Sequence, residues 1–195
     1  MKKTALLAAA MAVLVASPAF AHLNPAEHGS FAAGFSHPLS GADHVLAMVT
    51  VGLLASMLGG RAMVAVPAAF LGAMLLGFCA ALAGMPLPFV EPVVLASVTV
   101  LGLLVALAMP VSAVTAAIIA GVFAFFHGHA HGGEIDGATA LSYGFGFALA
   151  TAALHLAGIG VGLAAGRAMA GQAGRVAMRV AGGAAAVGGL VLLAG

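Results

Sequence analysis

Residues 62–84 read AMVAVPAAFLGAMLLGFCAALAG, a continuous apolar stretch that contains no charged side chain. At about 1.5 Å of rise per residue, a helix of this length spans the ~30 Å hydrocarbon core of a bilayer. Comparable apolar runs lie on both sides of it, separated by glycine, proline or charged residues. The sequence therefore predicts an all-α integral membrane protein with a six-helix transmembrane bundle. We place its spans near residues 41–59, 62–84, 91–109, 111–127, 140–164 and 176–194.

The composition of the whole chain supports the same fold class. Of its 195 residues, 64% are hydrophobic and only 6% are charged, whereas a soluble domain carries about 25% charged residues. This excludes a water-soluble globular domain. It also excludes a nucleic-acid partner, because the sequence has no basic patch that could neutralise phosphates. The single cysteine, Cys79, excludes an intramolecular disulfide framework.

The first 21 residues are typical of a cleaved secretory signal peptide. Two lysines near the start precede a short apolar run, which ends in the small-x-small sequence Ala19-Phe20-Ala21. An uncleaved first membrane helix is the alternative interpretation. Cleavage after Ala21 would leave one membrane domain over residues 22–195, with no soluble domain attached.

The distribution of charges predicts how the bundle is oriented. If the mature N-terminus starts outside, every arginine of the spans and loops falls inside and every acidic residue falls at or near the outer face. Positive charge favours the cytoplasmic side of a membrane protein. We therefore expect a multi-pass protein of the bacterial inner membrane, with both mature termini in the periplasm.

Eight histidines among so few polar residues are the chemical anomaly of this sequence. A first group consists of His37, Asp43 and His44. Because a residue before proline disfavours the helical conformation, we expect His37 at or just before a helix start. In one continuous helix His37 and His44 would be ~10 Å apart along the axis, too far for one ion to bridge comfortably, although an entry ligand followed by a deeper ligand would fit. Ionisable groups within a membrane usually mark a pathway, and Asp43 could ligate an ion or orient a neighbouring imidazole.

A second group consists of His127, His131 and Glu134. The three share one face if the fourth span stays helical this far. We expect the glycines between them to fray the helix, so that the ligands lie on a loop lining a cavity. Imidazole and carboxylate ligands without a thiolate suit Ni(II), Co(II) or Zn(II).

Four further residues are weaker candidates for a metal pathway, and each has a plain alternative. His22 is a solvated histidine or, after cleavage, a ligand through its ring and α-amine. His129 lies between two stronger candidates. His155 lines a pathway or satisfies a polar group in the bundle. Glu91 is a ligand or an ordinary interfacial charge at a helix start.

These residues resemble the HupE/UreJ family of nickel/cobalt permeases. The family pattern His-Pro-x-x-Gly-x-Asp-His-x-x-x-Met is matched from His37 to Met48. The pattern Phe-His-Gly-x-Ala-His-Gly-x-Glu is matched from Phe126 to Glu134. The signal peptide and the six spans extend the resemblance over the whole chain. Leu54 replaces the tryptophan that the family usually has after the first motif.

The resemblance implies transport of nickel or cobalt as substrate, with no resident cofactor, in support of hydrogenase, urease or cobalamin enzymes. It does not choose between the two metals, and the energy coupling stays open. Glycines at every fourth position from Gly158 to Gly166 indicate close helix packing in a bundle or a homo-oligomer. The functional residues that the resemblance implies are His37, Asp43, His44, His127, His131 and Glu134.

Two other functional classes remain as alternatives. A metal-binding accessory protein for hydrogenase or urease maturation could use the same ligands without conducting. An intramembrane protease is disfavoured, because the chain has no His-Glu-x-x-His motif. His155 with its following glycines resembles a rhomboid helix, but Ser40-Gly41 lacks the Gly-x-Ser-Gly nucleophile motif. We therefore expect no enzyme.

Overall fold

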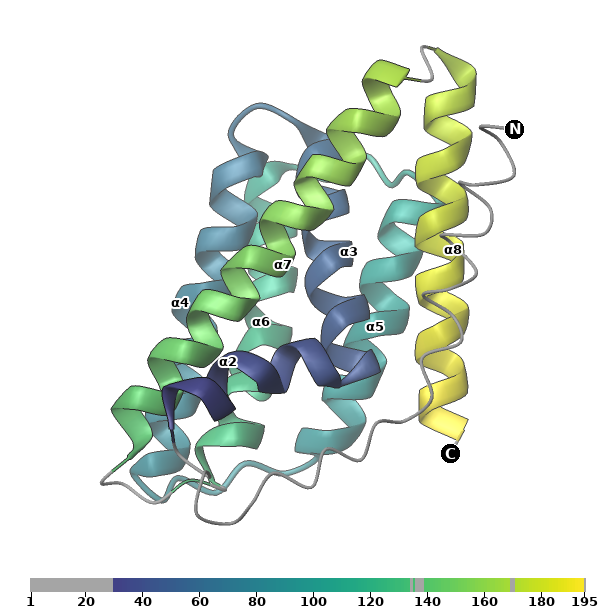
Figure 1. Ribbon diagram of the computed structural model, residues 1–195. Helices are drawn as coiled ribbons and strands as arrows, with labels where there is room; N and C mark the ends of the chain where they lie inside the picture. Colours follow the sequence, from purple (N-terminus) through teal and green to yellow (C-terminus); the bar gives the residue numbers. More distant parts are fainter. Residues whose placement is uncertain (1–29, 134, 136–138, 169–170, 195) are drawn as a thin grey trace.

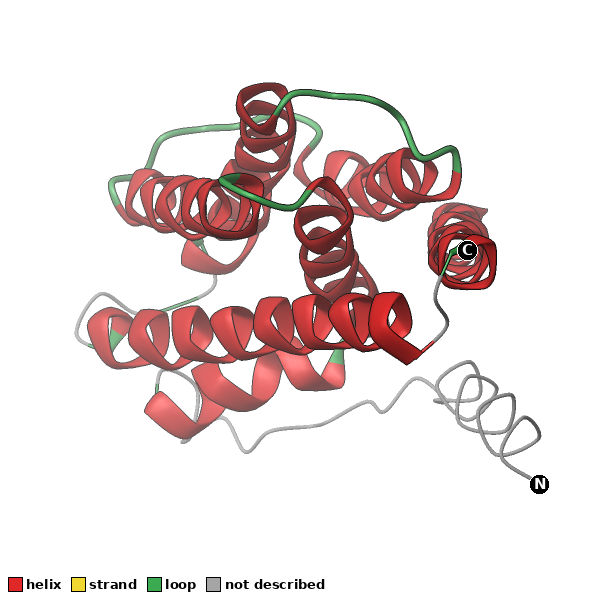
Figure 2. Ribbon diagram, turned by 90° about the horizontal axis from the view of Figure 1, so that it is seen from above, coloured by secondary structure: helices red, strands yellow, loops and turns green. Residues whose placement is uncertain are grey.

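The computed structural model describes residues 30–133, 135, 139–168 and 171–194. The predicted signal peptide, His22 and Glu134 lie outside the described residues. Within them the regular structure is entirely helical (Figure 1; Figure 2). The helices are α2 (Phe31–Ser40), α3 (Ala42–Leu58), α4 (Ala62–Leu82), α5 (Val90–Ala106), α6 (Ala113–Gly132), α7 (Ala140–Ala168) and α8 (Gln172–Ala194).

The predicted membrane character is visible in the lengths and surfaces of these helices. Four of them, α4, α6, α7 and α8, are long and apolar enough to cross a membrane. The pair α2 and α3 passes the same test together but is bent by 81° at its break, and α5 is a shorter apolar helix of 17 residues. Large apolar side chains such as Val64, Ile118 and Leu141 face outward, as expected of a helix bundle whose solvent is lipid.

Helix α3 is the centre of the bundle, because it packs against α2, α4, α5, α7 and α8. Its side chains from Val51 to Ala55 are all buried. Helix α2 lies across the lower end of the bundle in Figure 1, against α7 and the start of α3. The central helix α3 therefore begins close to α2 and to other helices that pack against it.

Several boundaries differ from the sequence prediction. Helix α2 precedes the first predicted span, and α5 ends at Ala106 rather than near 109. Helix α6 continues to Gly132 rather than ending near 127, α7 continues to Ala168 rather than ending near 164, and α8 begins at Gln172 rather than near 176. The expected fraying of α6 is wrong for a physical reason. A Cβ at Gly128 or Gly132 would collide with the α4 backbone at Met74 or Phe78, so these glycines permit close helix packing.

Glycine contacts of this kind pair the helices throughout the bundle. Gly77 of α4 lies against the backbone of Phe125 in α6, and Gly52 of α3 lies against that of His155 in α7. Gly158 of α7 in turn lies against the backbone of Val49 in α3, whereas Gly166 has nothing within 4 Å of its Cβ position. The predicted close packing is thus confirmed within the bundle at Gly158 and at Gly162, whose Cβ would collide with Ser56, whereas Gly166 makes no such contact within the chain. Small residues let helices approach closely in lipid, where van der Waals contact replaces the hydrophobic effect.

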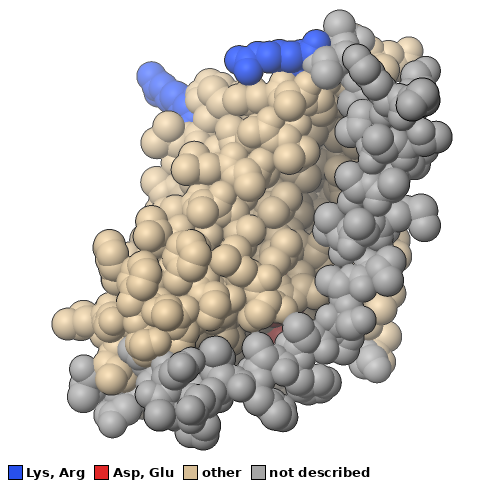
Figure 3. Space-filling model, in the orientation of Figure 1, with Lys and Arg blue, Asp and Glu red and all other residues tan. Residues whose placement is uncertain are grey.

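The charges of the described residues separate to opposite ends of the bundle. Figure 3 shows the basic side chains at the upper end and acidic colour only near the lower end. The arginines lie before α4, in the last turn of α7 and in the first turns of α8. The described acids, Asp43 and Glu91, lie in the first turns of α3 and α5. We call these the arginine end and the acidic end.

Candidate metal centre

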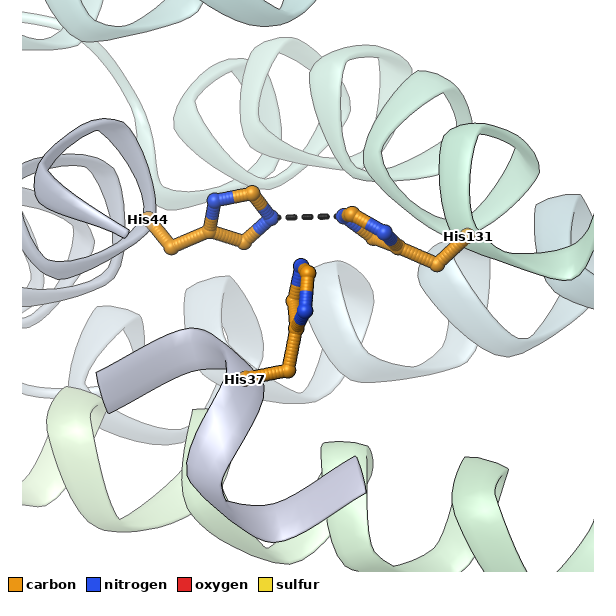
Figure 4. Close-up of side chains that lie close together, drawn as sticks. All are labelled: His37, His44 and His131. Carbon is orange, nitrogen blue, oxygen red and sulfur yellow. Dashed lines mark hydrogen bonds between the residues drawn. The ribbon is translucent and has the colours of Figure 1, made fainter. Parts of the chain in front are cut away.

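Three histidines from three helices meet near the acidic end of the bundle. His37 comes from α2, His44 from α3 and His131 from α6, and their rings point toward one another (Figure 4). One ring nitrogen of each lies within 4.8 Å of the others. His44 and His131 are buried and His37 is half-buried. We call this group the histidine trio.

The position of His37 corrects the sequence prediction. His37 lies in the last turn of α2 and Pro38 is inside that helix, rather than both standing at a helix start. The chain then turns at Gly41, whose extended backbone separates α2 from α3. Because the two helices meet at 81°, the His37 and His44 rings are 5.3 Å apart between centroids. The ~10 Å separation of a continuous helix therefore does not occur, and one ion could contact both rings.

The spacing of the trio is close to what a divalent ion needs. The Nε2 atoms of His44 and His131 are 2.7 Å apart and share a hydrogen bond. Two imidazole nitrogens on one ion, each at about 2.0–2.1 Å, lie about 3.0–3.4 Å from one another. The His44–His131 pair must therefore open by a few tenths of an ångström. His37 must move inward by more, because the ligand atoms of the trio are spread over up to 4.8 Å.

Asp43 contacts the trio through His44. Its Oδ2 lies 2.8 Å from His44 Nδ1, so the carboxylate favours the tautomer with its proton on Nδ1. That tautomer leaves the Nε2 lone pair directed at His131. A carboxylate behind a ligating imidazole commonly fixes the ring and raises its basicity. The geometry thus supports the second of the two roles expected for Asp43.

His127 lies one turn of α6 from His131 and is fully buried. Its ring is 5.3 Å from that of His44, between centroids. Its Nε2 is 2.9 Å from Ser97 Oγ, whose own hydroxyl donates to the Val94 carbonyl. Because the Ser97 proton is used there, His127 donates from Nε2 and keeps its lone pair on Nδ1, which has no protein partner.

Two aromatic rings of α7 pack against the trio. Phe147 of α7 is 1% exposed, and its ring centroid lies 5.0 Å from that of His131 and 6.1 Å from that of His44. Tyr143 stacks on Phe147 and reaches the ring of His37. These rings exclude water from one side of the trio, which strengthens any charge interaction inside it.

Comparison with known proteins assigns the chain to a family. A family model described as HupE / UreJ protein matches residues 9–192. The chain belongs to the HupE/UreJ family. A curated relative, Protein HupE of Rhizobium leguminosarum bv. viciae, is 44% identical over 182 residues, which is 93% of this chain and 94% of the relative. No solved structure matches the chain significantly.

The three weaker candidates that the structure of this HupE/UreJ protein describes lie apart from the trio. His129 faces away, and its Nε2 is 2.7 Å from the backbone carbonyl of Met85, in the connection between α4 and α5. That contact gives the imidazole a structural role. Glu91 is exposed in the first turn of α5. His155 is 1% exposed near the middle of α7, against the ring of Phe70.

Sequence reasoning missed three features that position the site. They are Ser97, which contacts His127, Phe147, which packs against His131, and the turn at Gly41, which brings His37 beside His44. Ser97 carried a usable signal, because it is a polar residue within a predicted apolar span. Phe147 carried none, since an aromatic residue in an apolar helix is most often ordinary packing.

Proposed function

We propose that this HupE/UreJ family protein is a secondary permease that carries divalent nickel, or cobalt, across the bacterial inner membrane into the cytoplasm. The observation that carries the proposal is the histidine trio, with three imidazoles from three helices within 4.8 Å at one end of an apolar bundle. The metal ion is the substrate, and no resident cofactor and no enzymatic reaction are proposed.

The chemistry of the trio suits transport better than permanent storage. Neutral imidazoles with one carboxylate bind borderline divalent ions, whereas a closed thiolate site would release them slowly. Conduction requires binding that is favourable enough to capture the ion and weak enough to let it leave. We assign capture and partial dehydration to His37, His44 and His131, with Asp43 holding His44. His127 and, from its place in the second motif, Glu134 complete the proposed ligand set.

The charge asymmetry supports an inward-facing arginine end. By the positive-inside rule, the acidic end with the trio then faces the periplasm, where it meets incoming ions. Together with this orientation we propose six membrane spans, a cleaved signal peptide and mature termini that both lie in the periplasm. We further propose that the metal serves hydrogenase, urease or cobalamin enzymes, as the resemblance implies.

The deciding experiment is uptake of radioactive nickel, with cobalt as competitor, in cells that lack their own nickel importers. The wild-type protein should accumulate nickel, and His44→Ala at matched membrane abundance should abolish the gain. His129→Ala is the matched control, because it removes an imidazole of α6 whose Nε2 is directed at the Met85 carbonyl rather than at the histidine trio. Uptake should persist in this variant. A properly inserted wild type that binds nickel without taking it up would refute the permease and favour a non-conducting accessory protein.

A further inference from the structure

His155 is a buried imidazole that the histidine trio does not use. It lies near the middle of α7, and its side chain is 1% exposed. Neither ring nitrogen has a hydrogen-bond partner in the described protein. A polar group left unpaired in an apolar interior costs free energy, and an ionisable residue within a membrane is usually functional. Both observations indicate that this ring has a partner that is not a protein group.

His155 is connected to the trio by a continuous line of rings. The ring of His127 follows that of His44, at 5.3 Å between centroids. The ring of Phe70 lies 5.8 Å from His127 and 5.0 Å from His155, edge to face with the latter. Phe70 therefore packs against both imidazoles, and the route from His127 to His155 that these rings mark runs along its ring.

The depth of His155 places it inward of the trio. Its carbonyl faces Gly52 of α3, which is eight residues after His44. This corresponds to about 12 Å along the helix axis. An ion held at His155 would therefore be well inside the bilayer, too far from the trio to share its ligands.

Further donor atoms lie one turn away from His155. Thr151 precedes it by one turn of α7 and is fully buried, and its Oγ1 lies 3.7 Å from the sulfur of Met74 in α4. Met74 is itself one turn from Phe70. Imidazole, hydroxyl and thioether together suit a borderline first-row ion better than a hard ion such as Mg²⁺.

A cavity of about 610 Å³, open to the surface beside exposed residues of α8, lies beyond His155 toward the arginine end. Ser56 and Gly162 line it, one turn beyond Gly52 on α3 and two turns beyond His155 on α7. His155 thus lies between the trio on one side and this inner cavity on the other.

We infer that His155 is the imidazole ligand of a second, inner binding site for a divalent first-row cation. The ion reaches it from His127 past Phe70 and leaves it through the inner cavity. The inference rests on the proposed permease function. A buried water that satisfies both ring nitrogens is the competing explanation, and it predicts a structural histidine that no ion reaches.

The first test separates capture from passage. His155→Ala should lower the initial rate of nickel uptake about 10-fold or more, because even the loss of an outer-shell partner of a metal ligand typically costs 10- to 100-fold. Nickel binding at the trio, measured by calorimetry on the purified full chain in detergent, should keep its affinity. His44→Ala should weaken both. Full uptake by a folded His155→Ala protein would overturn the inner site and leave the permease intact, whereas no uptake by the wild type would overturn the permease.

The second test is spectroscopic and stands even if His155→Ala fails to fold. In a Cys79→Ser background, His155→Cys puts the only thiol of the chain at the inner site. Added Co(II) should then give a sulfur-to-cobalt charge-transfer band. Leu154→Cys, the neighbouring position on α7, is the matched control and should give none. A folded His155→Cys protein without the band, or an equal band from Leu154→Cys, would overturn the proposal.

Discussion

His44 Nε2 and His131 Nε2 lie 2.7 Å apart, although 87 residues separate them in the chain. Two sets of contacts produce this approach. The turn at Gly41 starts α3 beside α2, and the glycines of α6 let that helix lie directly against α4. A hydrogen bond between these two nitrogens needs a proton on one of them. An ion that binds both Nε2 atoms requires that proton to move, either to Nδ1 of the same ring or away from the pair, so metal capture here is coupled to proton movement.

Asp43→Asn should weaken nickel binding about 10- to 100-fold, the usual cost of losing a carboxylate behind a ligating histidine. The amide keeps the size of the side chain but loses the charge that holds the proton of His44 on Nδ1, 2.8 Å away. Titration calorimetry on the purified protein measures the affinity, and circular dichroism verifies the helix content.

A double-mutant cycle shows whether Asp43 acts through His44. In a His44→Ala background, Asp43→Asn should cause little further loss, because coupled residues are not additive. Equal losses in the two backgrounds would instead indicate that the carboxylate ligates the ion directly.

Gly41→Ala should leave the protein folded but impair nickel binding and uptake. The backbone at Gly41 is extended (φ −87°, ψ 123°), so alanine is conformationally tolerated. Its Cβ, however, would lie 2.8 Å from Asp43 Oδ1 and 3.1 Å from His44 Nδ1. The flexible carboxylate would have to move away from His44. Calorimetry should show weaker binding at an unchanged melting temperature, and wild-type affinity would contradict the importance of this contact.

The sequence was sufficient to predict the membrane-helical class and the residues that form the trio. Long uncharged runs can satisfy their backbone groups in lipid only as helices or closed barrels, and their length selects helices. His37, His44 and His131 stood out because polar side chains are rare in such a chain. These signals are local in the sequence, so they can be recognised without knowledge of the tertiary structure.

The arrangement of the trio could not be predicted, because it depends on contacts distant in sequence. Pro38 indicated a helix start, yet α2 forms before it and packs against α7. This is visible at Gly34 and Gly146, which meet the backbones of Tyr143 and Phe31 respectively. Tertiary packing thus outweighed the local preference of the residue before proline.

Ser97→Ala should reduce nickel uptake and lower the melting temperature, because it leaves the buried Nε2 proton of His127 without an acceptor. An unpaired buried donor costs about 1–3 kcal/mol. The ring is then free to change tautomer, which removes the Nδ1 lone pair from the path of the ion. Uptake assays and thermal unfolding in detergent measure the two effects.

Thr99→Val is the matched control for Ser97→Ala. Thr99 lies on the same helix, and its hydroxyl contacts the Ala186 carbonyl of α8 at 3.4 Å rather than the ring of His127. It should alter stability only slightly and leave uptake unchanged. An equal loss of uptake in both variants would mean that α5 packing, rather than the His127 contact, is responsible.

Gly77→Ala should destabilise the protein, whereas Gly72→Ala on the same helix should not. In an open helical position alanine is favoured over glycine by about 1 kcal/mol, and Gly72 has nothing within 4 Å of its Cβ position. At Gly77 the Cβ would collide with the backbone of Phe125, and overpacking costs about 1–3 kcal/mol. The sign of the change in melting temperature should therefore reverse between two chemically identical substitutions. Since Phe125 lies two residues before His127, forcing α6 away from α4 should also weaken nickel binding in Gly77→Ala alone. Equal melting temperatures and affinities in the two variants would show that close contact between α4 and α6 does not position the histidines.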